Sequence, residues 1–275
     1  MRLRPPGVLA PVAALGLAVA AVAAPRAVVE VRPGSLVRWP GAALEACAVG
    51  QRRFAPMPDG CVFAVDLLHP AGPLLLERWR GGRREAATVR VGRFDYPTQT
   101  LSLPPAMVEP APADAERIRR ENEEIARLWG REGERRFTLP LQPPLDPLPP
   151  GGRFGSRRVI NGQARSPHGG ADYAAPTGTP VLAAADGVVA LVGDHFFGGH
   201  SVFLDHGGGL ITMYFHLSAV DVEEGAAVKR GERVGAVGSS GRATGPHLHF
   251  GVRWHGARVD PRWLLEDPQA LPVVP

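Results

Sequence analysis

The most informative stretch of this 275-residue sequence is PHLHFGVRWH, at residues 246–255. Apolar side chains alternate in it with polar or small ones, the apolar set being Leu248, Phe250, Val252 and Trp254. Because successive side chains of a β-strand point to opposite faces, this pattern predicts a strand with one apolar and one polar face. We expect His247 and His249 to lie together on the polar face.

A second strand with similar alternation is predicted at residues 211–217, ITMYFHL. Its expected apolar face consists of Ile211, Met213, Phe215 and Leu217, and its expected polar face of Thr212, Tyr214 and His216. A third segment, PHGGADY at residues 167–173, contains His168 and Asp172. Its proline and two glycines disfavour a helix and predict a loop that leads into a strand.

These three segments contribute four imidazoles and one carboxylate: His168, Asp172, His216, His247 and His249. Two histidines and a carboxylate, with one position left for water, form the ligand set of a catalytic zinc ion. The pattern therefore predicts a metal site that closes only in the folded sheet. We expect four other histidines to lie on the surface, namely His69, His195, His200 and His255, and His206 to belong to a hairpin turn in DHGGG.

The ordered set of motifs resembles the lysostaphin/LytM-type zinc metalloendopeptidases of peptidoglycan. The resemblance covers residues 151–260 and is carried by FGSR (154–157), His168-x-x-x-Asp172, GTPV (178–181), DG (186–187), YFHL (214–217), VKRG (228–231) and GPHLH (245–249). It implies an antiparallel β-sheet with an open groove, peptidoglycan peptides as substrate and one zinc ion. The implied zinc ligands are His168, Asp172 and His249, and the implied catalytic residues are His216 and His247. YPTQ (96–99) and the helix after it resemble the amino-terminal region of Gram-negative members more weakly.

The sequence contains no H-E-x-x-H motif, so the usual glutamate base of a zinc peptidase is absent. His216 or His247 must then take the proton of the attacking water. Three alternatives are an inactive relative that activates another cell-wall hydrolase, a biotinyl- or lipoyl-like module, and a structural zinc protein. An inactive relative typically lacks metal ligands, but here all five site positions are filled. A biotinyl- or lipoyl-like module would need its lysine in a Met-Lys-Met turn, and Lys229 does not lie in one. A structural zinc site normally has four protein ligands, often cysteines, which these strands do not offer.

The rest of the chain predicts an exported, mainly β protein. Residues 1–24 have a basic start, an apolar run and an Ala21-Val22-Ala23 site, which is typical of a signal peptide; an uncleaved anchor is the alternative. Residues 25–105 predict a small β-sandwich-like domain, with its clearest strands at 28–31, 61–68, 74–79 and 88–94. Export predicts an oxidising location, in the periplasm or elsewhere in the cell envelope, where Cys47 and Cys61 are expected to form a disulfide.

Residues 106–150 predict a connector, formed by a helix at 114–129 capped by Asp114 and a stiff proline-rich spacer at 139–150. The zinc peptidase domain is expected at 151–275. The chain has thirty arginines and one lysine, but its 27 acidic residues leave a net charge of only +4. Nucleic-acid binding is therefore not expected. No segment after the signal peptide is apolar enough for membrane insertion, and no oligomeric state is predicted.

Overall fold

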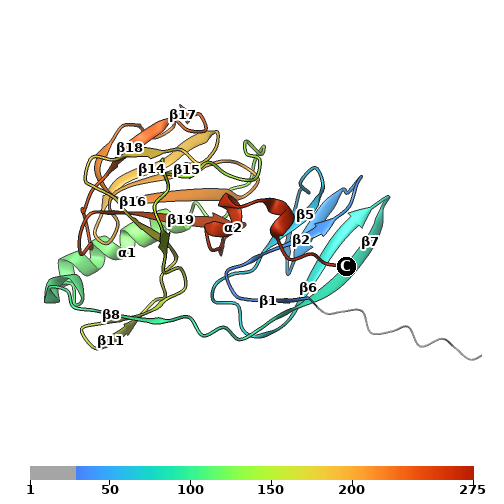
Figure 1. Cartoon of the computed structure of the whole chain (residues 1–275), viewed down its shortest axis with the longest axis horizontal. Coiled ribbons are helices and arrows are strands. Elements are labelled where there is room, and N and C mark those ends of the chain that lie inside the picture. The colour runs from blue at the N-terminus through green and yellow to red at the C-terminus, as the bar shows by residue number, and fades with distance from the viewer. Residues whose placement is uncertain (1–28) are drawn as a thin grey trace, which may run out of the picture.

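The computed structural model describes residues 29–275, and the predicted signal peptide lies outside them. Two β regions lie beside each other, with the amino-terminal strands in blue to turquoise and the larger sheet in yellow to red (Figure 1). Helices are few and short apart from α1, residues Pro112–Ala126; α2 spans Arg262–Leu265. The predicted mainly β fold, with one connecting helix and a large antiparallel sheet, is confirmed.

The amino-terminal region contains two small sheets. The larger has the strand order β1-β7-β6-β3-β4, and β2 pairs with β5 in the smaller. The predicted runs correspond to β1, β5, β6 and β7, whereas β2, β3 and β4 were not foreseen. The strands are β1 (Glu30–Val31), β2 (Leu36–Pro40), β3 (Ala46–Val49), β4 (Arg52–Phe54), β5 (Gly60–Ala64), β6 (Gly72–Arg80) and β7 (Arg83–Val91).

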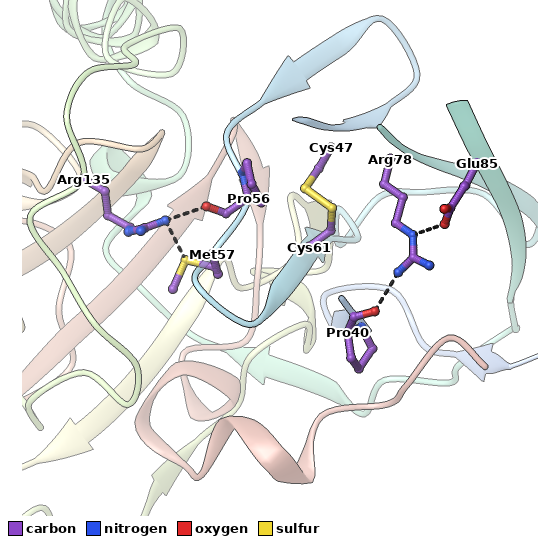
Figure 2. Close-up of a disulfide and its surroundings, with 8 residues drawn as sticks. All are labelled: Pro40, Cys47, Pro56, Met57, Cys61, Arg78, Glu85 and Arg135. Carbon is purple, nitrogen blue, oxygen red and sulfur yellow. Dashed lines mark hydrogen bonds and ion pairs between the residues drawn. A yellow bond between two sulfur atoms is a disulfide. The ribbon is translucent and has the colours of Figure 1, made fainter. Parts of the chain in front are cut away.

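A disulfide joins the two small sheets, since Cys47 lies on β3 and Cys61 on β5 (Figure 2). The predicted pairing is therefore confirmed. Both cysteines are fully buried in the apolar core between the sheets. The loop between β4 and β5 is attached to the connector, because Arg135 donates a 2.9 Å hydrogen bond to the Pro56 carbonyl and contacts the Met57 sulfur (Figure 2).

The large sheet has ten strands, and every pairing in it is antiparallel. Its main path runs β17-β14-β15-β16-β19-β12-β9, with β13, β18 and β20 attached at the sides. Its strands are β9 (Gly151–Gly152), β12 (Gly170–Ala174), β13 (Pro180–Leu182), β14 (Gly187–His195), β15 (Gly199–Asp205), β16 (Leu210–Val220), β17 (Ala227–Val228), β18 (Arg233–Val237), β19 (His247–Trp254) and β20 (Ala257–Arg258).

The connecting helix differs in its start and end from the prediction. Asp114 lies in the first turn of α1 rather than at its cap, because Ala111 occupies the cap and Pro112 the first helical position. Proline fits there since its missing N–H has no helical partner to lose. Arg117 of α1 donates to the Asp194 carbonyl, and Glu121 accepts a 2.9 Å hydrogen bond from the Phe196 amide. The helix therefore lies against the end of the β14–β15 hairpin.

The proline-rich segment at 139–150 packs closely onto the large sheet instead of acting as a free spacer. Leu141 and Leu145 are 1% exposed and belong to the main hydrophobic core. Leu36 and Val62 of the amino-terminal region share that core. The carboxyl-terminal segment in turn reaches the amino-terminal sheets, where Val274 donates a 2.8 Å backbone hydrogen bond to Arg38 (Figure 1).

A third sheet connects the two regions and has the strand order β11-β10-β8. Strand β8 (Thr98–Leu101) leaves the amino-terminal region and pairs in parallel with β10 (Arg157–Ile160), which pairs with β11 (Gln163–Arg165) (Figure 1). Within residues 29–275, no helix combines the length and the apolar character needed to cross a membrane.

Candidate metal centre

The centre of the site is the antiparallel pair β12–β19, in which Asp172 lies directly opposite His249. Side chains opposite each other on neighbouring strands point to the same face, so this register places the carboxylate beside the imidazole. The alternation predicted for β19 is also observed. Its apolar side is buried, with Leu248, Phe250 and Val252 at 0% exposure.

Three polar atoms of this site converge closely. The Nε2 atom of His168 lies 2.8 Å from Nδ1 of His249. Both nitrogens lie 2.9 Å from the Oδ1 atom of Asp172. His168 comes from the loop before β12 and is fully buried. The loop thus brings a third polar group to the two that the strand register places together.

The donor set fits a zinc ion. His168 donates its Nδ1–H to the Arg153 carbonyl at 3.0 Å, which leaves a lone pair on Nε2 directed at the other two atoms. Atoms with lone pairs this close together repel one another unless a cation or a shared proton lies among them. Two imidazole nitrogens and one carboxylate oxygen are the ligands that a catalytic zinc ion takes from a protein, with one position left open.

The protonation states of the cluster suit metal binding. Burial lowers the pKa of His168 to about 4, so this imidazole is neutral at neutral pH. Burial alone would raise the pKa of Asp172, but its contacts with His168 and His249 hold it well below the ordinary range. A neutral imidazole and an ionised carboxylate are the forms that bind a metal.

His247 lies two residues before His249 on β19, on the same face of the sheet. It donates its Nδ1–H to the Gly245 carbonyl at 2.8 Å. Its other nitrogen, Nε2, therefore carries a lone pair and lies 3.8 Å from the Asp172 carboxylate. The hydrogen bond fixes the ring so that a proton acceptor faces the metal centre.

His216 reaches the same centre by a route that differs from the prediction. Phe215 packs with Met213 as expected, and it also pairs with His249 and stacks on its ring at a 5.3 Å centroid distance. A β-bulge places Phe215 and His216 opposite the single residue Ser201, and His216 has φ +63°. A bulge redirects the side chain that simple alternation would have turned to the other face.

The ring of His216 then lies 4.7 Å from that of His247 and 6.2 Å from that of His249, between ring centroids. It donates its Nδ1–H to the Ser240 carbonyl at 2.8 Å, so its Nε2 atom also carries a lone pair. Burial, with the neighbouring His249 and His247, lowers the pKa of His216 to about 3. All five predicted site residues are therefore brought together.

The five residues line an open groove of about 690 Å³. A sequence model of peptidase family M23 matches residues 166–261, which contain all five. A solved structure from Pseudomonas aeruginosa described as peptidase M23 is 31% identical, with a TM-score of 0.68, and the match covers 85% of this chain and 94% of that one. The chain belongs to peptidase family M23.

Two named M23 relatives are similar over shorter segments. Peptidoglycan DD-endopeptidase ShyC of Vibrio cholerae is 42% identical over 47% of this chain and 30% of its own length. DD-carboxypeptidase/endopeptidase Mpg of Neisseria meningitidis is 51% identical over 34% of this chain and 22% of its own. The chain thus matches less than a third of the length of these curated relatives.

The other histidines of this M23 chain correct two predictions. His195 and His255, expected on the surface, are largely buried: His195 is 6% exposed, and His255 stacks on Phe54 at 4.1 Å between ring centroids. His206 begins the predicted hairpin turn, yet it is fully buried and bonded to the Asp186 carbonyl and the Thr212 hydroxyl. His200 is exposed, and His69 is half-buried.

Sequence reasoning also missed polar residues of the groove wall in this M23 chain. Arg158 on β10, Arg242 on the loop before β19 and Gln99 on β8 all line the groove. The neighbouring Arg157 points outward to Asp95. Alternation along residues 157–160 could have indicated that Arg158 faces the other way, but not that β8 would lie beside it.

Proposed function

We propose that this chain is a zinc-dependent endopeptidase that hydrolyses stem peptides or peptide cross-links of peptidoglycan. The observation that carries the proposal is the cluster of His168, Asp172 and His249, flanked by two further imidazoles whose free nitrogens face it. We assign the three clustered residues as ligands of one zinc ion. His216 and His247 are assigned as the catalytic residues.

Zinc bound at the cluster would supply Lewis acidity toward the peptide carbonyl and lower the pKa of water. His216 and His247 provide the proton transfer that hydrolysis also needs. Each imidazole is held by an Nδ1–H hydrogen bond to a backbone carbonyl, and each keeps Nε2 free to accept a proton and to return it to the leaving amine. Burial keeps His216 unprotonated at neutral pH, so the lone pair on its Nε2 atom is free.

The substrate class follows from the groove and from the relatives. The groove is open along the sheet, so an extended peptide has access to the metal centre. ShyC is named for its action on peptidoglycan, and Mpg for carboxypeptidase and endopeptidase activity. A buried disulfide agrees with a location in the oxidising cell envelope, and with export through the predicted signal peptide.

The decisive experiment digests purified peptidoglycan with the full chain and with His249→Ala, followed by separation of the muropeptides. We expect the zinc-loaded protein to convert cross-linked dimers to monomers or to shorten stem peptides, and the variant to lose both zinc and activity. Zinc content is measured on both proteins. Intact muropeptides after treatment with the zinc-loaded protein would instead favour the non-catalytic, LytM-like activator of another cell-wall hydrolase.

A further inference from the structure

The wall of the groove carries an excess of positive charge. Arg153, Arg158 and Arg242 line it, while Asp172 is the one acidic side chain among the described lining residues. The charge of Asp172 is already engaged by the histidine cluster. The arginines therefore face a groove that offers them no other carboxylate from the described part of the chain.

Arg158 and Gln99 are neighbours on this wall, because the parallel pairing of β8 with β10 places them opposite each other. The Nη2 atom of Arg158 lies 3.8 Å from the Oδ2 atom of Asp172, so the guanidinium adjoins the metal centre. Its Nε atom and the Oε1 atom of Gln99 are buried without a hydrogen-bonding partner in the described structure. Buried polar atoms normally have a hydrogen-bonding partner, so this wall has an unmet donor on Arg158 and an unmet acceptor on Gln99.

Arg242 approaches from the other chain segment of the wall, the loop between β18 and β19. Its guanidinium lies over the ring of Phe197 at 4.1 Å, and its backbone amide donates a 3.0 Å hydrogen bond to the Phe197 carbonyl. Burial, Arg158 and Arg165 lower the pKa of Arg242 to about 10, which still leaves it charged at neutral pH. Its guanidinium makes no hydrogen bond or ion pair with the described residues.

We propose that Arg158, Arg242 and Gln99 form a subsite for a free α-carboxylate of the peptide substrate, next to the bond that is cut. The subsite rests on the proposed endopeptidase function and assigns three residues to the recognition of a free α-carboxylate beside the scissile bond. An acylated amino-acid unit with a free α-carboxylate carries an acceptor and an N–H donor on one Cα. The carboxylate pairs with the guanidinium groups, and the N–H donates to Gln99.

Arginine is suited to this role because its planar guanidinium binds a carboxylate through two parallel hydrogen bonds. Lysine would supply charge without that geometry. The recognised group is thus defined by shape as well as charge, and replacing the carboxylate by a carboxamide removes both the charge and two acceptor positions.

The test uses two synthetic peptides that are identical except for a free α-carboxylate or a carboxamide beside the scissile bond. For the zinc-loaded full chain we expect kcat/KM to favour the acidic peptide by at least about 10-fold. Arg158→Gln and Arg242→Gln should each reduce this preference to less than about 2-fold. The matched control is Arg157→Gln, which removes an equal charge from the outward face of the same strand and should keep the full preference.

Zinc content is measured for every variant, because Arg158 adjoins Asp172. Equal cleavage of the two peptides by the unaltered chain would overturn the subsite while leaving the endopeptidase function intact. An undiminished preference in Arg242→Gln, together with zinc loss in Arg158→Gln, would also overturn it, because Arg158 would then act only through Asp172.

Binding of both peptides to the metal-free full chain, measured by calorimetry, separates the subsite from catalysis. At least about 10-fold tighter binding of the acidic peptide, lost in Arg242→Gln, supports the subsite even if neither peptide is cleaved. Absence of cleavage with the zinc-loaded chain counts against the proposed function instead. Equal binding of the two peptides counts against the subsite.

Discussion

Strand β19 of the large sheet and strand β5 of the amino-terminal region are both central to their cores, yet they leave very different surfaces. Every residue of β5 is buried, because both of its faces are covered and a disulfide lies at its start. One face of β19 is covered along its whole length, whereas on the other face His247 and His249 open into the groove. The proposed catalytic residues thus lie on a part of the sheet that packing leaves free. Substitutions in the groove should therefore change zinc binding and activity, whereas substitutions in the amino-terminal region should change stability.

The largest expected effect is the loss of a proposed metal ligand on the open face. Asp172→Ala should reduce zinc content from one ion per chain to near zero and peptidase activity by at least about 1,000-fold, because both the Lewis acid and its water are lost. Metal analysis and peptide cleavage check this. Asp221→Ala, which removes a carboxylate paired with Arg233 elsewhere on the large sheet, should retain both.

Next in size is the effect of His216→Ala. We expect activity to fall by about 100- to 10,000-fold while zinc stays bound, because only a proton-transfer group is removed. His200→Ala, at an exposed position of the adjoining strand, serves as the control and should be fully active. A zinc-loaded His216→Ala protein with normal activity would show that His216 has no catalytic role.

The covered region should respond in the opposite way. Replacing Cys47 and Cys61 together by serine removes a crosslink between residues 14 positions apart in the sequence. Because this crosslink restricts the unfolded chain, we expect the free energy of unfolding to fall by about 3 kcal/mol. Activity and zinc content of the folded protein should stay close to normal, because the disulfide lies outside the groove. Urea denaturation and cleavage assays on the same preparation test both halves, and a parallel loss of zinc would show that the regions are not separable.

The smallest predicted effect concerns pH and the buried His206. Burial lowers its pKa to about 4, whereas in the unfolded chain it lies near 6.5. Between these values the unfolded chain binds a proton that the folded chain does not, so stability falls as the pH falls. From pH 7.5 to 5.0 this histidine should cost about 2 kcal/mol of unfolding free energy.

His206→Gln removes that titration. We expect the variant to be less stable than the unaltered chain at pH 7.5, because hydrogen bonds to Asp186 or Thr212 are lost. The difference should narrow by about 2 kcal/mol at pH 5.0 in urea titrations. A difference that stays constant with pH would contradict a neutral, buried His206.

Alternation was sufficient to predict the faces of β19, because that strand is regular and one of its faces is covered. It failed on β16, where a bulge adds a residue between Tyr214 and Leu217 that apolar spacing does not reveal. The burial of His255 depends on Phe54 from the amino-terminal region. The groove wall depends likewise on the parallel pairing of β8 with β10. Contacts between distant segments have no local signature, so these features emerged only in three dimensions.

The bulge at Phe215 and His216 makes the site depend on chain length as well as on residue type. Two residues occupy the space opposite Ser201, and only this surplus directs His216 to the same side as Phe215. A single deletion there would restore plain pairing and keep an apolar strand, yet it would remove an imidazole from the groove. An insertion opposite it in β15 would do the same. In this hairpin, a one-residue insertion or deletion should therefore reduce activity more than most substitutions do. When related sequences are compared at this position, a gap is more informative than a change of residue type.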